Sequence, residues 1–469
     1  MSKLTRYVVQ FWFVGLMASV GMVSTIWADE FVYGEVSGVW SINRSPFVVV
    51  GEITIPEGAS LTIEPGVEIF FAGSYAFNVR GRLSAVGGND EARRITISGR
   101  PTVEWRGIFF FPEADARSQI VNCDIRGAHI GIDLNRSFVT IRGCRIEARF
   151  VGINCLGTTS EISYNLLIRA YDPNSLYDVK AISVRTGSAP LIVGNQLVEA
   201  VAQGGGEAFG IYVSESSPII RENWIEAESD YRALSIFISR AEKADIYHNI
   251  IRGRSSGVIR GVWTVQSTGV RLVNNTIHSA MTSDNAVGVV VDRGAEVVLI
   301  NNIIVGNGLS IGDSTVYGQV HRSSGWNAYW AHKTVHAGEW SGGEGEVTED
   351  PYFENLSPIR EEADYRLRWD DYPHGRRSPC IDAGYPQMED PDGTRSDIGR
   401  FYYEHEPNFV TPDKESHPQT PFLVEAYPNP FNASLNIVVR GGAVQGREIK
   451  VYDLTGRLAS IIRIWEDSG

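Results

Sequence analysis

Residues 220–225 read Ile-Arg-Glu-Asn-Trp-Ile, and the same pattern returns at residues 246–251 and 272–277. Each copy has an apolar residue, two variable residues, an Asn or Cys, any residue and a second apolar residue. Eight copies occur between residues 120 and 305, and their fourth positions are 21, 21, 30, 28, 26, 26 and 27 residues apart. These anchor residues are Cys123, Cys144, Asn165, Asn195, Asn223, Asn249, Asn275 and Asn302. A period of this length indicates stacked supersecondary units.

A second pattern lies 12 to 14 residues before the next anchor and has a small residue followed by Ile or Val, as in Gly210-Ile211 and Gly261-Val262. Apolar and polar residues then alternate, which is typical of a short strand with one buried face. Three strands, two tight connections and one variable loop per repeat predict an all-β parallel β-helix. Each coil would stack about 4.8 Å beyond the previous one.

The recurring Asn residues predict a ladder along one corner of this β-helix. Asn tolerates a left-handed backbone at a sharp turn, and its amide can bond the Asn above and below, which satisfies a buried polar group. Cys123 and Cys144 occupy the same column in neighbouring coils, and Cys155 falls on an inward position. We favour buried free thiols in a column of small residues. A bridge between Cys123 and Cys144 is the alternative, because stacked Cys are close enough to form one.

These repeats resemble those of the secreted right-handed parallel β-helix proteins of the pectin-lyase-like group. Further stretches resemble their opening coils and their closing segment, namely residues 38–40, 53–58, 61–66, 105–108, 350–353, 364–367, 378–384 and 397–399. The resemblance implies that the Asn marks the second turn, that the next strand belongs to the third sheet, and that a variable third loop leads into the first sheet. We assign residues 29–402 to the β-helix, with a capping segment over about 305–402. One fold hosts many functions, so the resemblance implies no particular reaction.

The first 28 residues have the pattern of an export signal. Lys3 and Arg6 precede an apolar run from Tyr7 to about Trp27, and Ala28 offers a small residue for cleavage. An uncleaved anchor is the alternative, because about 20 apolar residues can cross a bilayer. We favour cleavage, and we expect no stable membrane span after it.

A third module follows a linker at residues 403–421 that is rich in Pro, Glu, His and Asp. Residues 422–469 alternate and turn like a small Ig-like β-sandwich. They resemble the C-terminal sorting domain recognised by the type IX secretion system, through Pro428, Asn429, Pro430, Phe431, Tyr452, Asp453, Gly456 and Arg457. That family continues through more strands, so the predicted domain is incomplete, and an ordinary Ig-like appendage is the alternative. The resemblance implies the type IX machinery as a partner and a secreted or cell-surface location in a Gram-negative-type bacterium.

One face of the predicted β-helix carries a column of aromatic residues. In enzymes that share this fold, the resemblance implies a substrate groove on the outer face of the first sheet. If Ile211 and its equivalents point inward, Tyr212, Phe237 and Trp263 follow one another outward on consecutive coils. Aromatic rings can stack on the apolar faces of sugars, so we predict a carbohydrate-stacking platform. The alternative is that loops or the segment at 305–400 cover these rings.

Charged residues on the same face do not assemble into a catalytic site by spacing alone. Asp133 and Arg185 lie two coils apart, and Asp292 lies four coils beyond Arg185. A lyase would need carboxylates that hold Ca²⁺ and a basic Arg or Lys, and a hydrolase would need paired carboxylates. Further charges stand on loops and are interpreted as solvated, namely Asp172, Asp178, Lys180, Asp230, Arg232 and Asp284.

Residues Asp390, Asp392 and Asp397 resemble a Ca²⁺ loop superficially. They offer only three carboxylates and lack the terminal Glu of an EF-hand, so we favour a turn that closes the β-helix. We see no metal-ligand spacing among the Cys and His residues. We therefore predict no cofactor, with Ca²⁺ at these three residues as the open alternative.

The 42 Lys and Arg residues against 56 Asp and Glu residues give a net charge of −14, which disfavours a nucleic acid partner. The leading hypothesis is a secreted or cell-surface β-helix that binds polysaccharide or another surface polymer along its first sheet. A polysaccharide-active lyase, hydrolase or epimerase is the first rival, and a structural stalk or adhesin-like protein is the second. The sequence leaves open whether the protein is an enzyme.

Overall fold

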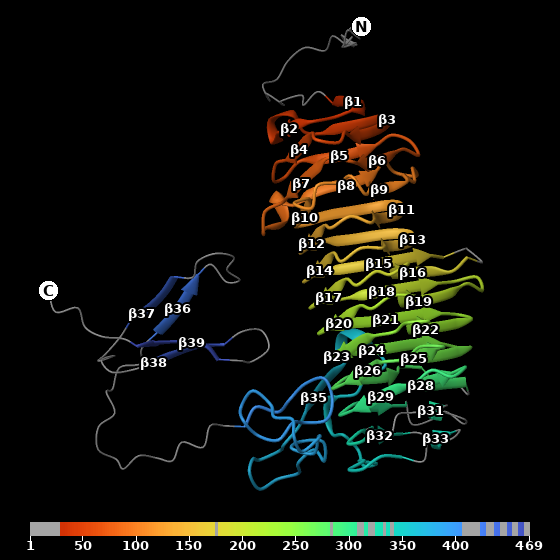
Figure 1. Cartoon of the computed structure of the whole chain (residues 1–469), viewed down its shortest axis with the longest axis vertical. Helices are drawn as coiled ribbons and strands as arrows, with labels where there is room; N and C mark the ends of the chain where they lie inside the picture. The colour runs from red at the N-terminus through yellow and green to blue at the C-terminus, as the bar shows by residue number, and fades with distance from the viewer. Residues whose placement is uncertain are drawn as a thin grey trace, which may run out of the picture.

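The computed structural model describes residues 29–173, 177–281, 285–306, 324–331 and 342–405, together with the backbone of six further strands. Strands dominate the chain, and the parallel sheets form a β-solenoid of about 10 turns. The coils stack along the long axis from β1 to β33 (Figure 1). The predicted all-β parallel β-helix is therefore confirmed. Within the described residues, no helix has the length and hydropathy that a membrane crossing requires.

The second sheet of the solenoid has 11 parallel strands, each contributed by one coil. Its strands are β2 (Gly38–Trp40), β4 (Ser60–Ile63), β7 (Arg82–Val86), β10 (Gln119–Val121), β12 (Thr140–Arg142), β14 (Glu161–Ser163), β17 (Leu191–Val193), β20 (Ile219–Arg221), β23 (Ala244–Tyr247), β26 (Val270–Val273) and β29 (Val297–Ile300). Each is short because the anchor turn follows it almost at once.

The third sheet begins after the anchor turn. Its strands are β5 (Glu68–Phe71), β8 (Ile95–Gly99), the first parts of β11 (Cys123–Asn135) and β13 (Arg145–Leu156), β15 (Leu167–Asp172), β18 (Val198–Ala202), β21 (Trp224–Ser229), β24 (Ile250–Ser255), β27 (Thr276–Ser279), β30 (Ile303–Val305) and β32 (Ala328–Trp330). β1 (Glu30–Glu35) and β3 (Phe47–Ile55) open the solenoid and also run from the third sheet into the first.

The first sheet follows the third loop, as predicted. It contains β6 (Ala76–Val79), β9 (Gly107–Phe110), the later parts of β11 and β13, β16 (Val179–Arg185), β19 (Glu207–Ser214), β22 (Arg232–Ser239), β25 (Val258–Val265), β28 (Asn285–Asp292), β31 (Ser314–Tyr317) and β33 (Thr334–Ala337). Because several strands turn the corner without a break, the first and third sheets form one 22-stranded hydrogen-bonded network.

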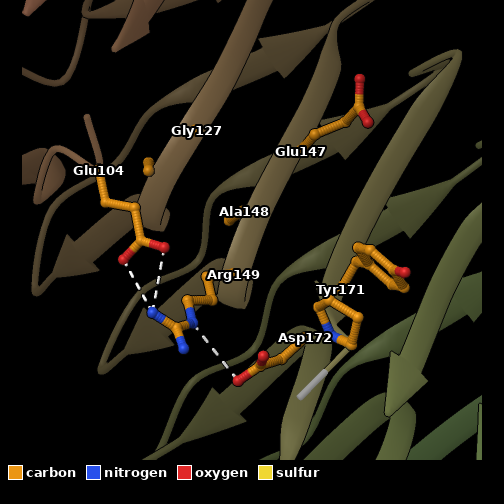
Figure 2. Close-up of a pocket in the computed structure, with 9 residues that line it drawn as sticks. Glu104, Gly127, Glu147, Ala148, Arg149, Tyr171 and Asp172 are labelled. Carbon is orange, nitrogen blue, oxygen red and sulfur yellow. Dashed lines mark hydrogen bonds and ion pairs between the residues drawn. The ribbon is translucent and has the colours of Figure 1, made fainter. Parts of the chain in front are cut away.

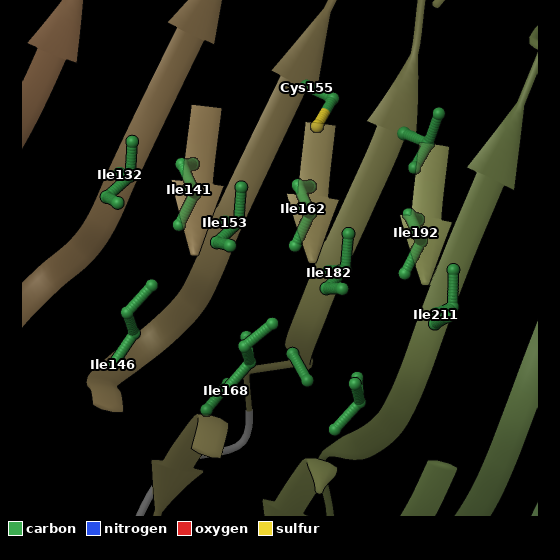
Figure 3. Close-up of a cluster of buried hydrophobic side chains, with 14 of the residues drawn as sticks. Ile132, Ile141, Ile146, Ile153, Cys155, Ile162, Ile168, Ile182, Ile192 and Ile211 are labelled. Atoms are coloured by element: carbon green, nitrogen blue, oxygen red, sulfur yellow. The ribbon is translucent and has the colours of Figure 1, made fainter. Parts of the chain in front are cut away.

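Aliphatic side chains fill the interior in columns that run along the axis. Ile132, Ile153, Ile182 and Ile211 pair in register on consecutive first-sheet strands and are fully buried. Figure 3 shows this column beside the second-sheet isoleucines, with Cys155 in the same interior. All four Cys residues are free and buried. The repeated apolar positions therefore stabilise each coil by packing it against the next, at about 1.5–3 kcal/mol for each fully buried side chain.

The predicted Asn ladder is present. Asn195 donates from its backbone N–H and from Nδ2 to Oδ1 of Asn223, at 3.0 and 2.7 Å, and Asn223 bonds Asn249 in the same way. The ladder continues one step beyond the sequence prediction, because Asn302 bonds Oδ1 of Asn327. The sequence pattern does not predict Asn327, because Ser324 stands where the repeat has an apolar residue.

The left-handed residue at each corner is not the anchor Asn that the sequence predicts. The left-handed residue is the one before each anchor, as at Glu222 and His248, whose φ angles are 59° and 54°. None of the Asn residues at the anchors is among the residues with positive φ. The preceding residue turns the chain, so the anchor Asn can point inward and bond its neighbours along the axis.

The segment at residues 342–405 folds back along the side of the solenoid (Figure 1). It contains β34 (Phe353–Asn355), η3 (Arg360–Glu362) and β35 (Asp364–Leu367). Tyr365, Leu367 and Ile398 pack on Ile250 and Ile303 of the third sheet. The predicted capping segment therefore covers part of the lateral face of the third sheet, and we call residues 342–405 the closing segment.

The remaining elements are short. Two 3-10 turns, η1 (Ile42–Arg44) and η2 (Glu91–Arg93), lie in early coils. Near the C-terminus, β36 (Leu423–Tyr427) pairs antiparallel with β37 (Asn436–Arg440), and β38 (Glu448–Tyr452) pairs antiparallel with β39 (Leu458–Arg463). The predicted signal at residues 1–28 lies outside the described residues.

Candidate functional site

The aromatic residues predicted for the outer face of the first sheet stand in register. Tyr212, Phe237 and Trp263 pair across β19, β22 and β25, between Ser183 on β16 and Val290 on β28. Tyr212 and Phe237 stack with ring centroids 5.4 Å apart and an interplanar angle of 22°. The rings of Phe237 and Trp263 meet edge to face at 5.5 Å. Consecutive coils thus build one aromatic column, and all three rings are half-buried.

Side chains of the same sheet shield this column in part. Phe209 and Leu234 lie beside it and are almost fully buried. Ala208 belongs to the interior core, whereas the ring of Phe209 contacts those of Tyr212 and Phe237. The alternation of inward and outward side chains therefore shifts by one position at Gly210, while β16 and β19 stay in register.

Two cations flank the aromatic column. Nζ of Lys180 lies 5.0 Å from the ring centroid of Phe209 and 5.5 Å from that of Tyr212. The guanidinium of Arg232 lies 5.2 Å from the ring of Trp263 and forms an ion pair with Glu207. Burial lowers the pKa of Lys180, because the charged ammonium loses hydration there. The rings are thus bordered by charged groups that can also donate hydrogen bonds.

A polar cluster continues the same column on the coils that precede Tyr212. Asn154 pairs with Asp133 on one side and with Ser183 on the other. Its Nδ2 donates to Oδ2 of Asp133 at 2.9 Å, and its Oδ1 accepts from Nη2 of Arg185 at 3.1 Å. The structure therefore connects Asp133 and Arg185, which sequence spacing kept apart. Sequence reasoning missed Asn154, and only the strand register could have identified it as the bridge.

Burial governs the electrostatics of this cluster. It raises the pKa of Asp133, while the hydrogen bond from Asn154 and the charge of Arg185 lower it. Ser183 is almost fully buried, and its Oγ has no hydrogen-bond partner within the described part of the chain. Asp133, Asn154, Ser183 and Arg185 therefore form a compact polar patch next to Tyr212.

Other predicted charges lie elsewhere. Asp292 pairs with Arg293 at 4.0 Å, and four strand pairings separate it from Arg185. Asp230 accepts hydrogen bonds from the backbone of Gly204 and Gly205, so it holds a loop. Asp178 forms a 3.8 Å ion pair with Lys180 at the edge of the aromatic column. Asp172 lies at the corner between the third and first sheets, and Asp284 falls outside the described residues.

The three Asp residues considered for Ca²⁺ mainly accept backbone hydrogen bonds. Asp397 accepts from the N–H groups of Asp382 and Tyr403, both at 2.6 Å, and Asp390 accepts from the N–H of Asp397 at 2.7 Å. Asp392 accepts from the N–H of Thr394 at 3.0 Å. Within the described residues, no group of three or more His, Cys, Asp or Glu side chains is placed to hold a metal ion. These bonds fit the predicted closing turn.

The same carboxyl groups predict a pH dependence of the closing segment. Burial raises the pKa of Asp390 to about 6 and that of Asp397 to about 7. The folded chain then binds more protons than the unfolded chain between about pH 4 and pH 7, so the free energy of unfolding falls as the pH rises through that window. We expect the closing segment to resist proteolysis better at pH 5 than at pH 8, by on the order of 2 kcal/mol in opening free energy.

Asp390→Asn keeps an acceptor for the Asp397 N–H and should reduce this pH dependence. Asp115→Asn is the matched control, because Asp115 is paired with Arg117 and its pKa is lowered. It should leave the difference between pH 5 and pH 8 unchanged. Equal resistance of the unsubstituted protein at the two pH values would contradict the prediction.

The residues of the predicted sorting motif mostly fall outside the described part of the chain. Pro428, Asn429, Pro430, Phe431, Asp453, Gly456 and Arg457 belong to this group. Tyr452 is the last residue of β38. The two antiparallel strand pairs agree with the predicted β-rich module, and the sorting role stays a prediction.

Comparison with protein-family models, with curated proteins and with solved structures found no match to this chain.

Proposed function

We propose that this protein binds an extended polysaccharide along the outer face of its first sheet, outside the cell or on its surface. The observation that carries the proposal is the aromatic column of Tyr212, Phe237 and Trp263, which runs over three consecutive coils. A repeat of about 4.8 Å per coil offers a polymer successive ring faces. Export rests on the sequence pattern of residues 1–28 and on the resemblance of residues 422–469 to a sorting domain.

The polar patch supports this assignment by giving the aromatic column a hydrogen-bonding end. Sugar hydroxyl groups both donate and accept. Asp133 can accept, Arg185 can donate, and Asn154 fixes both side chains before any ligand arrives. Apolar stacking on one part of a face and oriented polar groups on the next is the combination expected of a carbohydrate site.

A polysaccharide-active enzyme is the second candidate, and one observation favours it. Asp133 has a raised pKa and Lys180 a lowered pKa, and the charge of Arg185 acts on both. These are the directions that favour a lysine as general base and a carboxyl group as general acid. If the protein is a structural stalk instead, the outer face of the first sheet binds no ligand.

Trp263→Ala is expected to weaken binding of a polysaccharide to the purified protein about tenfold, equivalent to about 1.4 kcal/mol. The ring is half-buried, so its loss removes stacking area without opening the interior. Affinity electrophoresis against a panel of neutral and uronate polymers measures the effect. Tyr247→Ala is the matched control, because Tyr247 is also half-buried but belongs to the second sheet.

Equal weakening by the two substitutions, or the absence of any binding polymer, would refute the proposal, and the second result would favour a stalk. Shortening of a bound polymer during the same experiment, abolished by Lys180→Met, would support the enzyme.

A further inference from the structure

Beyond the opening strands β1 and β3, the row of third loops along the solenoid is interrupted at two coils. β11 and β13 pass from the third sheet into the first without a break, so these two coils have no third loop. The coil before them carries residues 100–106 between β8 and β9, and the coil after them continues from β15 into Pro173. Two missing loops leave a notch about 10 Å wide at this corner.

The notch is a pocket of about 330 Å³. Gly127, Ala128 and Ala148 line it, and Ala128 pairs with Ala148 at the corner. These small side chains keep the backbone close to the pocket. The volume lies at the lower end of the range for small-molecule sites. The pocket is thus a separate concavity beside the first-sheet face, and it shares no lining residue with the aromatic column or the polar patch.

A fixed ionic bridge crosses the pocket. Figure 2 shows Arg149 between Glu104 and Asp172. Nη1 of Arg149 lies 3.0 and 2.9 Å from the two carboxylate oxygens of Glu104, and Nε lies 3.4 Å from Oδ2 of Asp172. The side chain of Asp172 is only 2% exposed, and His129 holds Glu104 through a 2.7 Å contact. The side chains of Arg149 and Glu104 are 38% and 45% exposed, so a ligand can reach the bridge, and the buried Asp172 anchors one end of it.

We propose that this pocket binds a single neutral pyranose residue. A guanidinium between two carboxylates alternates donors and acceptors, and this order matches vicinal hydroxyl groups, which can donate to a carboxylate and accept from Arg149. The ring of Tyr171 is 38% exposed at the same pocket. The guanidinium of Arg169 lies over the ring at 4.9 Å from its centroid, so the other ring face is the surface offered to the C–H face of the sugar.

The charges at the pocket decide between neutral and anionic sugars. Glu104 and Asp172 place two carboxylates on the single guanidinium of Arg149, and Glu147 is paired with Arg126 at 3.6 Å. A uronate or sulfated sugar would be repelled by the net negative charge of the pocket, whereas a neutral sugar would meet no such repulsion. The inference goes beyond the first-sheet proposal and does not depend on it, because it concerns another corner of the coils.

Titration of the purified full chain with methyl glycosides, followed by saturation-transfer NMR, tests the inference. The probes are the methyl β-pyranosides of glucose, galactose and mannose, with methyl β-glucuronide as the anionic comparison. We expect at least one neutral glycoside to bind, and Tyr171→Ala to raise its Kd about fivefold. Arg149→Lys keeps the charge but loses the planar fork, so it should weaken binding as well.

Matched controls separate this pocket from the rest of the surface. Tyr177→Ala removes a tyrosine that is 72% exposed and does not line the pocket, so it should leave the Kd unchanged. Trp263→Ala should also leave it unchanged, and Tyr171→Ala should leave polymer binding on the first sheet intact. The inference is overturned if no neutral glycoside binds, if the glucuronide binds equally well, or if Tyr171→Ala and Tyr177→Ala behave alike.

Discussion

Replacing Asn223 with alanine is expected to lower the free energy of unfolding by about 3–5 kcal/mol. Oδ1 of Asn223 accepts two hydrogen bonds from Asn195, and its Nδ2 donates to the carbonyl of Ile192 at 3.0 Å. Asn223 is 1% exposed. Alanine would leave both donors of Asn195 and the carbonyl of Ile192 without these partners in the interior. Urea unfolding followed by circular dichroism measures the loss.

Asn78→Ala is the control for this prediction. Asn78 lies half-buried on the outer face of the first sheet, and its amide reaches Glu52 and Thr54 only at 3.4 and 3.5 Å. Long hydrogen bonds at a partly hydrated site contribute little, so we expect a loss below about 1 kcal/mol. If the two substitutions cost the same, the ladder is not a main source of stability.

Arg252→Met is expected to destabilise the protein by about 3–5 kcal/mol at pH 8. Arg252 is fully buried between the third sheet and the closing segment. Its guanidinium lies 3.5 Å from Oε2 of Glu226 and donates to the carbonyl of Pro358 at 2.7 Å. Arg360 of the closing segment completes the network through Glu199 at 2.6 Å. Without Arg252, Glu226 keeps a buried charge with less compensation.

The pH dependence of this loss identifies its cause. Burial raises the pKa of Glu226 even with both arginines present. Removing Arg252 raises it further, so the folded variant takes up a proton as the pH falls and the carboxylate is neutralised. The loss in unfolding free energy should therefore be smaller at pH 4.5 than at pH 8. Denaturant unfolding at the two pH values provides the comparison.

Arg254→Met is the matched control on the same strand. Arg254 pairs with Glu228 at 3.4 Å, and both side chains are about one-third exposed. Exposed pairs contribute about 0–1 kcal/mol, so this substitution should have little effect. An Arg252→Met loss that stays constant with pH would show that packing, and not the charge on Glu226, accounts for it.

The repeat alone predicts most of the solenoid, because the contacts that define a coil are local and recur. The inward position of Ile211 and the anchor position of Asn223 recur in successive coils. Their pattern is therefore visible in the sequence without any information on long-range contacts. Asn327 was missed where one apolar position of the pattern is Ser324. The sequence predicts the left-handed backbone at the anchor Asn, whereas the structure has it at the preceding residue, as at Asn274 before Asn275.

The candidate sites were predicted less completely because they depend on register and on distant contacts. The aromatic column follows from inward and outward alternation, but Phe209 joins it only because that alternation shifts by one position at Gly210. Asn154 becomes a bridge only when its strand lies between those of Asp133 and Arg185. Nothing near Arg252 in the sequence indicates that Pro358, 106 residues later, covers it. The pocket at Arg149 depends likewise on loops that two coils lack.

The closing segment gives the rod a mechanical polarity. In a solenoid each coil contacts mainly its two neighbours. A solenoid stretched from its ends would therefore unfold one coil at a time from either end. The contacts of the closing segment run from Glu199 of β18 to Ala328 of β32, and they tie these coils across the direction of stacking. Under tension we expect the amino-terminal coils to peel first at low force and the tied coils to rupture together at higher force. A load transmitted along the protein would then extend its amino-terminal coils and leave the tied carboxy-terminal coils folded until a higher force is reached.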